Sequence, residues 1–286
     1  EDVDHAACHL LHQADFIAAK LMGQGGLSDH NNALKTGFDP ETEMWPDWVE
    51  ACKLNPSLLP EVRPVGAQLA AINPQVATEL GLSRSVTIHA GTTDSIAAFL
   101  ACAPLQEGAA VTSLGTTLAV KLLSPNRIDD PEIGLYSHRL GTVWLVGGAS
   151  NTGGGVLLDH FSTDQISTLC KRIDPTKPTG LGFYPLSKPG ERFPIKDPDF
   201  VGRLSPRPKD DVIFLQAMLE GMAAVEARCY REIEVRGGGA PHQLFTAGGG
   251  AQNAVWTALR EIELGMDITA ATRSEAAIGS AKLAQI

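Results

Sequence analysis

The sequence predicts an α/β protein built from two domains. The β-branched run VTIHAG, 86–91, leads directly into the small-residue helix SIAAFLAC, which is typical of a strand-to-helix turn. The second half of the chain predicts the order β-β-β-α, a long insertion, and then α-β-α-β-α. The chain has 286 residues, a length that allows a well-buried core and favours two domains over one.

The first hundred residues predict several helices and one strand. Residues 4–22 carry apolar side chains at helical spacing and end at a cluster of glycines. A segment rich in turn residues and Trp follows, with short helices expected around 46–54. A further helix, about 73–81, begins at the cap signal Asn73-Pro74. The strand 86–91 and its helix complete this part of the chain.

The second half begins with a β-hairpin and a third strand. Residues 108–124 alternate on both sides of a Gly-Thr-Thr turn, which indicates the hairpin. The strand TVWLVGGA, 142–149, runs into the glycine-rich NTGGG and a helix from about 154 to 161. Prolines and charges fill 176–210, a long insertion without a clear core period.

The last part predicts a long helix and two further strand-helix pairs. The long helix spans about 210–236. Its buried stripe is expected to comprise Ile213, Ala217, Leu219, Met222, Ala223 and Val225. The strand QLFTAGG, 243–249, leads into a helix from about 252 to 264. A short strand, DITAA, and a last helix, 274–284, follow.

Composition excludes several classes of function. The chain is 43% hydrophobic with a mean hydropathy of −0.02, and no apolar run approaches the ~20 residues of a membrane span. The net charge of −10 argues against a nucleic-acid partner, which usually needs a basic face. The negative charge fits a small-molecule ligand better than a nucleic acid. The first residues lack an initiator Met and the pattern of a signal peptide, and are typical of the interior of a longer protein.

Neither the cysteines nor the N-terminal histidines predict a metal centre. The cysteines are odd in number and form no C-x-x-C pair, which favours reduced thiols in a cytosol-like compartment. They are Cys8, Cys52, Cys102, Cys170 and Cys229. His5, His9 and His12 have a spacing that can hold a metal. No carboxylate is placed to complete a site, so surface or interface histidines are favoured.

Three glycine turns are candidates for phosphate binding. They are SLGTT (113–117), GGASNTGGG (147–155) and TAGGGAQNAVW (246–256), and each follows an apolar strand. Glycine permits positive φ and lets backbone N–H groups approach an anion. None is a Walker A loop, and none has the βαβ frame of a dinucleotide fingerprint. Each turn taken singly is equally compatible with a plain connection.

The turn TAGGGAQNAVW is the most informative of the three. Its helix is expected to start near Gln252, so the N–H groups of Gly249 and Gly250 can point at an anion. Asn253 and Trp256 share a face of the first helical turn and could flank an adenine, one by hydrogen bonding and one by stacking. The alternative is a capped helix with a buried Trp.

Charged residues are candidates for a functional role at two further positions in the sequence. Asp94, in HAGTTDS, lies at the strand-to-helix turn, where it is either a helix N-cap or a catalytic carboxylate, and the two roles are compatible. In the insertion, Lys188, Glu191 and Arg192 are charges of a loop expected to be mobile, which could close over a substrate. The favoured alternative for these three is a solvated ion-pair cluster.

The order of the motifs resembles that of the FGGY carbohydrate kinases over essentially the whole chain. The matching segments are VTIHAGTTDSIAAFLAC, GAAVTSLGTTLAV, GTVWLVGGASNTGG, FYPLSKPGERFPIKDPDFVGRL, LQAMLEGMAA, LFTAGGGAQNAVW and SEAAIGSAKLA. Within the family, they are most similar to D-ribulose or D-xylulose kinase-like proteins of plants and cyanobacteria. One departure is large, because the first third of the family pattern, with its Asp-x-Gly-Thr/Ser phosphate loop, is absent.

The resemblance implies an actin-like (ribonuclease H-like) ATPase fold with its active site between two domains. Residues 1–104 would be the remainder of an N-terminal sugar-binding domain, and 105–286 a complete nucleotide-binding domain. The implied reaction is ATP-dependent phosphorylation of a sugar hydroxyl, that of a pentulose such as D-ribulose or D-xylulose, with ATP/ADP and Mg²⁺ as cofactors. The alternative is a truncated nucleotide-binding module without kinase activity of its own. The implied location is the cytoplasm, or the plastid stroma in a plant, and the oligomeric state stays open.

The resemblance also assigns roles to individual positions. These positions are Asp94, Gly115, Thr116, Gly148, Gly153, Gly249, Gly250, Asn253 and Trp256. Asp94 matches the family's catalytic aspartate, the general base for the sugar hydroxyl. Gly115 and Thr116 match a hairpin that faces the β- and γ-phosphates. Gly249, Gly250, Asn253 and Trp256 belong to the adenosine pocket, and Gly148 and Gly153 match the family pattern only loosely. The resemblance assigns no metal-ligating side chain.

Overall fold

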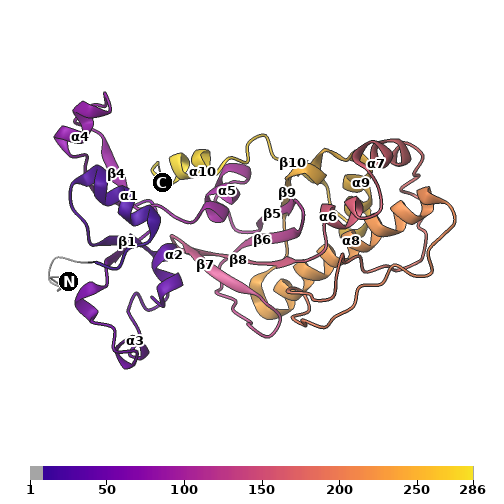
Figure 1. Cartoon of the computed structure of the whole chain (residues 1–286), viewed down its shortest axis with the longest axis horizontal. Helices are drawn as coiled ribbons and strands as arrows, with labels where there is room; N and C mark the ends of the chain where they lie inside the picture. The colour runs from indigo at the N-terminus through magenta and orange to yellow at the C-terminus, as the bar shows by residue number, and fades with distance from the viewer. Residues whose placement is uncertain (1–8, 286) are drawn as a thin grey trace. The chain divides into compact units, whose positions relative to one another are not determined.

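The computed structural model describes residues 9–285 and shows a mixed α/β protein (Figure 1). The described chain forms two compact units. Unit 1 comprises the residues up to Ala101, together with His138–Thr142 and the segment from Glu275. Unit 2 comprises Cys102–Ser137 and Val143–Ser274. Between residues 9 and 285 no helix is long and apolar enough to cross a membrane.

Unit 1 consists of short elements. β1 pairs with β2 in parallel orientation, and β3 pairs with β4 in antiparallel orientation. The strands are β1 (Leu27–Asp29), β2 (Glu61–Arg63), β3 (Gln68–Ala71) and β4 (Thr87–His89). The helices are α1 (Gln13–Met22), α2 (His30–Ala33), α3 (Trp48–Ala51), α4 (Pro74–Glu79), α5 (Asp94–Cys102) and α10 (Ala276–Leu283). Short 3-10 turns occur at Leu34–Thr36 and Pro56–Leu58.

A six-stranded sheet, whose strands belong to unit 2 except for residues 138–140 of β7, has the order β10-β9-β5-β6-β8-β7 (Figure 1). The strands are β5 (Ala109–Leu114), β6 (Leu118–Ser124), β7 (Tyr136–Leu140), β8 (Val143–Ser150), β9 (Gln243–Ala247) and β10 (Ile268–Ala270). β5 pairs with β6 and β6 with β8 in antiparallel orientation, whereas β5 pairs with β9 in parallel. β5, β8 and β9 therefore run in the same direction, and their C-terminal ends lie at the same end of the sheet.

Two helices pack together on this sheet. α8 contacts β6 and β8 and lies along α9 (Figure 1). The helices of unit 2 are α6 (Gly154–Leu158), α7 (Thr163–Cys170), α8 (Asp211–Ile233), continued by a π-helical turn at Glu234–Gly238, and α9 (Ala254–Leu264), preceded by a 3-10 turn at Gly249–Gln252. The predicted stripe of α8 is confirmed from Ala217 onward. It is wrong for Ile213, which is 43% exposed, because Val212 and Phe214 fill the core at the start of the helix.

Most predicted elements are present, with shorter bounds. The hairpin predicted over 108–124 is confirmed as β5 and β6, and the strand over 142–149 as β8. The helix predicted over 4–22 begins at Gln13, and residues 4–8 lie outside the described part. Six elements were not predicted from the sequence, namely β1, β2, β3 and α2 in unit 1, together with β7 and α7.

The insertion 176–210 is irregular but well packed. It contains no helix or strand, as expected from its composition. It nevertheless contributes Phe183 and Phe193 to the main hydrophobic core, where they are 4% and 0% exposed. The absence of a core period in the sequence therefore did not mean the absence of core residues.

Candidate functional site

The three glycine turns lie together at one end of the sheet of unit 2. They follow β5, β8 and β9, the strands that run in the same direction. Backbone contacts join the turn after β5 to each of the other two. The segments SLGTT, NTGGG and TAGGGAQN, which are far apart in the sequence, thus form one surface.

The turn 115–117 is exposed, and the start of α6 lies directly against it. The N–H of Gly154 donates to the carbonyl of Gly115 at 2.9 Å. Gly153 has a φ of +145°, and a Cβ there would lie 2.7 Å from the backbone of Thr117. Glycine is required at 153 because two backbones meet there without room for a side chain.

The turn 248–253 packs against Leu114, the last residue of β5. Gly248 has a φ of +89°, and a Cβ there would overlap the carbonyl of Leu114. A Cβ on Gly250 would lie 2.6 Å from the Trp256 ring and 2.8 Å from the Leu114 side chain. At Gly249 a Cβ would meet no atom within 4 Å. Among these glycines, Gly249 is the one that faces open space.

Asn253 and Trp256 are both engaged inside the protein. Asn253 Oδ1 accepts the N–H groups of Val255 and Trp256, each at 3.1 Å, and so caps α9, while its Nδ2 donates to Cys170 Sγ at 3.2 Å. Trp256 is 1% exposed. Stacking of an adenine requires an exposed ring face, which Trp256 does not offer in this structure. The two side chains support the turn from behind, Trp256 through its contact with Gly250.

Glu191 of the insertion anchors the middle glycine turn. It is 3% exposed, and its carboxylate accepts hydrogen bonds from Ser150 Oγ at 2.6 Å, the Asn151 N–H at 2.7 Å and the Tyr184 hydroxyl at 2.8 Å. Asn151 Nδ2 donates to the carbonyl of Gly190 at 2.9 Å. The expectation of a mobile or solvated charge is therefore wrong for Glu191, because donors from β8 and the insertion enclose it.

The charges of the insertion thus differ in their surroundings. Lys188 and Arg192 have exposed side chains, whereas Glu191 is buried. Burial, together with the adjacent Glu191 carboxylate, raises the pKa of the Tyr184 hydroxyl far above its usual range, so this group is a neutral donor. Glu191 fixes the geometry of the turn, and its role could not be found from sequence because its partners are up to 41 residues away.

Asp94 lies in unit 1, at the first turn of α5. The carbonyl of Thr93 accepts the N–H groups of Ile96 at 3.1 Å and Ala97 at 2.9 Å, so Thr93 occupies the cap position. The carboxylate of Asp94 is exposed and accepts the N–H of Ser95 at 2.6 Å. The backbone of Asp94 begins the helix, while its carboxylate stays open to solvent.

α10 holds α5 in place within unit 1. Lys282 Nζ donates to the carbonyls of Leu100 at 3.0 Å and Ala101 at 3.1 Å, near the C-terminal end of α5, where the helix dipole favours a cation. Gly279 packs so closely against the carbonyl of Ala97 that no Cβ would fit. The segment SEAAIGSAKLA thereby supports the helix that begins with Asp94.

Clusters of metal-ligating side chains and buried polar atoms without a partner are two features that can mark a ligand site. Residues 9–285 contain no group of three or more His, Cys, Asp or Glu side chains that could hold a metal ion. His5 and Cys8 lie outside this range. Two buried polar atoms without a hydrogen-bond partner, Thr152 Oγ1 and Trp256 Nε1, belong to the second and third glycine turns. Both atoms are buried, whereas the exposed turn 115–117 and the open Gly249 can be reached by a ligand.

A family model and curated relatives both match this chain. Residues 110–286 match the C-terminal domain of the FGGY family of carbohydrate kinases. A gluconokinase of Bacillus licheniformis is 25% identical over 265 residues, which cover 85% of this chain and 51% of that protein. The chain therefore spans about half the length of the curated relatives it matches.

Solved structures share the fold. A xylulose kinase from Rhodospirillum rubrum matches with a TM-score of 0.83 and 22% identity, over 98% of this chain and 59% of that one. Plasmodium falciparum glycerol kinase with ADP matches with a TM-score of 0.79 and 18% identity, over 96% of this chain and 57% of that one. The chain therefore has the mixed α/β fold of the actin-like ATPases. Because the match to the C-terminal domain extends over more than half of its residues, the chain belongs to the FGGY family of carbohydrate kinases.

Proposed function

We propose that this chain is the nucleotide-binding part, together with the general base, of an ATP-dependent sugar kinase. One observation carries the proposal, namely that three glycine turns meet at one end of the sheet of unit 2. Turns of this kind present backbone N–H groups to phosphate without a Cβ in the way. The exposed turn 115–117 and the open Gly249 are the parts of this surface that a nucleotide can reach.

The turns take different parts of the nucleotide in this proposal. Gly115 and Thr116 face the β- and γ-phosphates, and Gly249 and Gly250 lie along the adenosine. Asn253 and Trp256 act behind the third turn and keep its shape. The structure of a glycerol kinase of the same fold with ADP supports the proposal that this fold binds a nucleotide.

Asp94 is the proposed general base. Its exposed carboxylate takes the proton from the attacking sugar hydroxyl as the sugar oxygen bonds to the γ-phosphorus and the bond to the ADP oxygen breaks. General-base catalysis typically contributes about 10²–10⁴-fold to the rate. The proposed substrate is a pentulose, D-ribulose or D-xylulose, in keeping with the xylulose kinases among the relatives.

The two proposed domains divide this work. Residues 1–104 contribute to sugar binding and carry Asp94, and residues 105–286 bind ATP or ADP. In phosphoryl transfer of this class, Mg²⁺ neutralises the phosphate charge. Residues 9–285 contain no group of three or more His, Cys, Asp or Glu side chains that could hold a metal ion, and none of the steps proposed for this chain involves the metal.

The proposal is tested by a coupled assay of ADP release with the complete kinase that contains this chain. ATP, Mg²⁺ and a panel of D-ribulose, D-xylulose, D-gluconate and glycerol are supplied. We expect turnover with a pentulose, and we expect Asp94→Asn to lower kcat by about 10²–10⁴-fold while the ADP affinity measured by calorimetry stays within about twofold. Full turnover of Asp94→Asn would remove the base assignment, and turnover with D-gluconate or glycerol alone would remove the pentulose.

A second candidate is a nucleotide-binding module without transfer activity of its own. It is favoured by the observation that the chain spans about half the length of its curated relatives. The chain by itself, given ATP, Mg²⁺ and the same sugars, tests the module. The module predicts ADP binding without sugar-dependent ADP release, and sugar-dependent release by the chain alone excludes it.

A further inference from the structure

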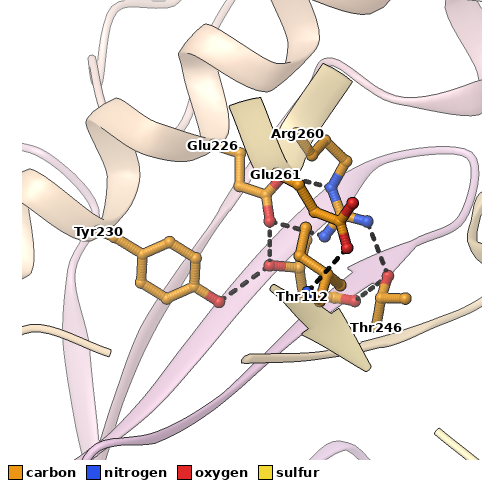
Figure 2. Close-up of polar contacts among 7 residues, drawn as sticks. Thr112, Glu226, Tyr230, Thr246, Arg260 and Glu261 are labelled. Carbon is orange, nitrogen blue, oxygen red and sulfur yellow. Dashed lines mark hydrogen bonds and ion pairs between the residues drawn. The ribbon is translucent and has the colours of Figure 1, made fainter. Parts of the chain in front are cut away.

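A buried ion pair joins α8 to α9 (Figure 2). Glu226 of α8 and Arg260 of α9 have fully buried side chains. Arg260 Nε donates to Glu226 Oε2 at 2.6 Å, and Arg260 Nη2 donates to Glu226 Oε1 at 2.8 Å. Burying two charges is costly unless their remaining hydrogen-bonding groups are also satisfied.

Two threonines on neighbouring strands complete the pair's hydrogen bonds. Thr112 of β5 and Thr246 of β9 are directly opposite each other in the parallel ladder. The Thr112 hydroxyl donates to Glu226 Oε1 at 2.5 Å, and Arg260 Nη1 donates to Thr246 Oγ1 at 3.0 Å. The Thr246 hydroxyl donates in turn to the carbonyl of Thr112 at 3.3 Å. The ion pair is therefore bonded to both strands.

The direction of each hydrogen bond in this network is fixed. Because the single Thr112 hydroxyl proton goes to Glu226, the Tyr230 hydroxyl must donate to Thr112 Oγ1, which lies 2.9 Å away (Figure 2). Burial and the Glu226 charge raise the pKa of Tyr230 well above its usual range and keep it protonated. In the described part of the chain, the buried side-chain atoms without a partner lie outside this network.

The network is close in sequence to the first and third glycine turns. Thr112 lies two residues before Leu114, the residue on which Gly248 and Gly250 pack. Thr246 lies two residues before Gly248. The network thus holds the last stretches of β5 and β9, from which the turns 115–117 and 248–253 emerge.

The same network also positions α9. Arg260 lies four residues after Trp256, so the two share a face of the helix. Trp256 in turn contacts Gly250 of the third glycine turn. A shift of α9 relative to the strands would therefore move this turn through Trp256.

We propose that Glu226 and Arg260 are positioning residues for nucleotide binding, which hold the turns 115–117 and 248–253 at the spacing that ADP requires. This inference rests on the proposed function. A buried ion pair is often replaceable by apolar residues without loss of stability, whereas its directional bonds can specify one geometry. A displacement of about 1 Å in a binding group can cost about 10²-fold in function.

The test is the double substitution Glu226→Met with Arg260→Met, which removes both charges together. We expect the double variant to fold with a lower melting temperature, because the buried Thr112 hydroxyl loses its acceptor, while calorimetry at 25 °C shows its Kd for ADP raised at least about 10-fold. The matched control is Asp130→Leu with Arg236→Met, which removes a partly exposed ion pair of unit 2 (2.7 Å between Arg236 Nε and Asp130 Oδ2). The control is expected to keep the Kd for ADP within about twofold.

A second pair of variants decides the question if the double variant does not fold. Thr112→Val keeps the shape of the side chain but removes the hydroxyl, and Thr112→Ser keeps the hydroxyl. We expect Thr112→Val to weaken ADP binding and Thr112→Ser to bind ADP as the wild type does. A folded double variant with wild-type ADP affinity, or equal affinities of the two Thr112 variants, overturns the positioning role. Absence of ADP binding by the wild type would instead overturn the proposed function.

Discussion

Gly250→Ala is expected to destabilise unit 2, whereas Gly249→Ala, one residue earlier, is not. A Cβ at 250 would lie 2.6 Å from the Trp256 ring and 2.8 Å from the Leu114 side chain. Trp256 and Leu114 are 1% and 0% exposed, so neither can move out into solvent. A Cβ at 249 would have no neighbour within 4 Å, and φ is not positive at either glycine. The two variants therefore differ in packing and not in backbone strain.

The expected size of the effect follows from the cost of overpacking a core, which is about 1–3 kcal/mol. For a domain of 150–250 residues, 1 kcal/mol corresponds to about 2–4 °C, so Gly250→Ala should lower the melting temperature by about 2–12 °C. Gly249→Ala should melt at or slightly above the wild-type temperature, because alanine restricts the unfolded chain. Urea unfolding followed by circular dichroism gives the free energies directly. Equal stabilities of the two alanine variants would refute the packing described for this turn.

Three further predictions concern the surroundings of the site. Asn253→Ala should lower the free energy of unfolding by about 0.5–2 kcal/mol, because α9 loses its cap. Asn253→Asp keeps the cap acceptor and should be about as stable as the wild type, and an alanine variant with wild-type stability in urea would speak against the cap. Glu191→Leu should lower the free energy of unfolding by about 1–3 kcal/mol for each donor left unpaired, at Ser150 and Asn151. Lys188→Ala, at an exposed position, should change the stability little. Similar urea midpoints for the two variants would contradict the anchoring role of Glu191. The exposed Cys52 should react with a thiol reagent faster than Cys170 and Cys229, because burial raises the pKa values of these two thiols. Labelling is measured by mass spectrometry of the three cysteine-containing peptides, and equal labelling of all three would exclude this burial.

The regular elements of unit 2 could be predicted from sequence because their signals are local. Alternation on both sides of Gly115–Thr116 determines the hairpin of β5 and β6. The length and apolar periodicity of 211–233 determine α8. The meeting of the three glycine turns also follows once strand directions are known, since each turn comes after a strand of the same direction.

Other elements were missed although the sequence contains a signal for some of them. α7 has few apolar residues, but Ser162 and Gln165 form a capping box that marks its start. Glu226 lies between Met222 and Tyr230 at a spacing of four residues, and a charge on an otherwise apolar stripe is a sign of a buried pair. Its partner Arg260, 34 residues away, could not be identified without the packing of α8 on α9.

Neither β7 nor the burial of Glu191 could be predicted from the local sequence. The strand YSHRL is mostly polar and takes its structure from pairing at the edge of the sheet, next to β8. Glu191 is surrounded by prolines and charges in the sequence, and its donors come from β8 and from the insertion itself. Both depend on tertiary contacts, which override the local pattern.

Calorimetric titration of ADP into the wild-type chain and into Gly249→Leu tests the central claim most directly. The side chain at 249 enters open space in the free protein, so Gly249→Leu should keep the wild-type melting temperature. If the surface formed by the three glycine turns binds the nucleotide, the same side chain obstructs the ligand, and the Kd for ADP should rise at least about 10-fold, or 1.4 kcal/mol. Absence of ADP binding by the wild type, or equal ADP affinity of a folded Gly249→Leu variant, would contradict the claim that these turns form the nucleotide site.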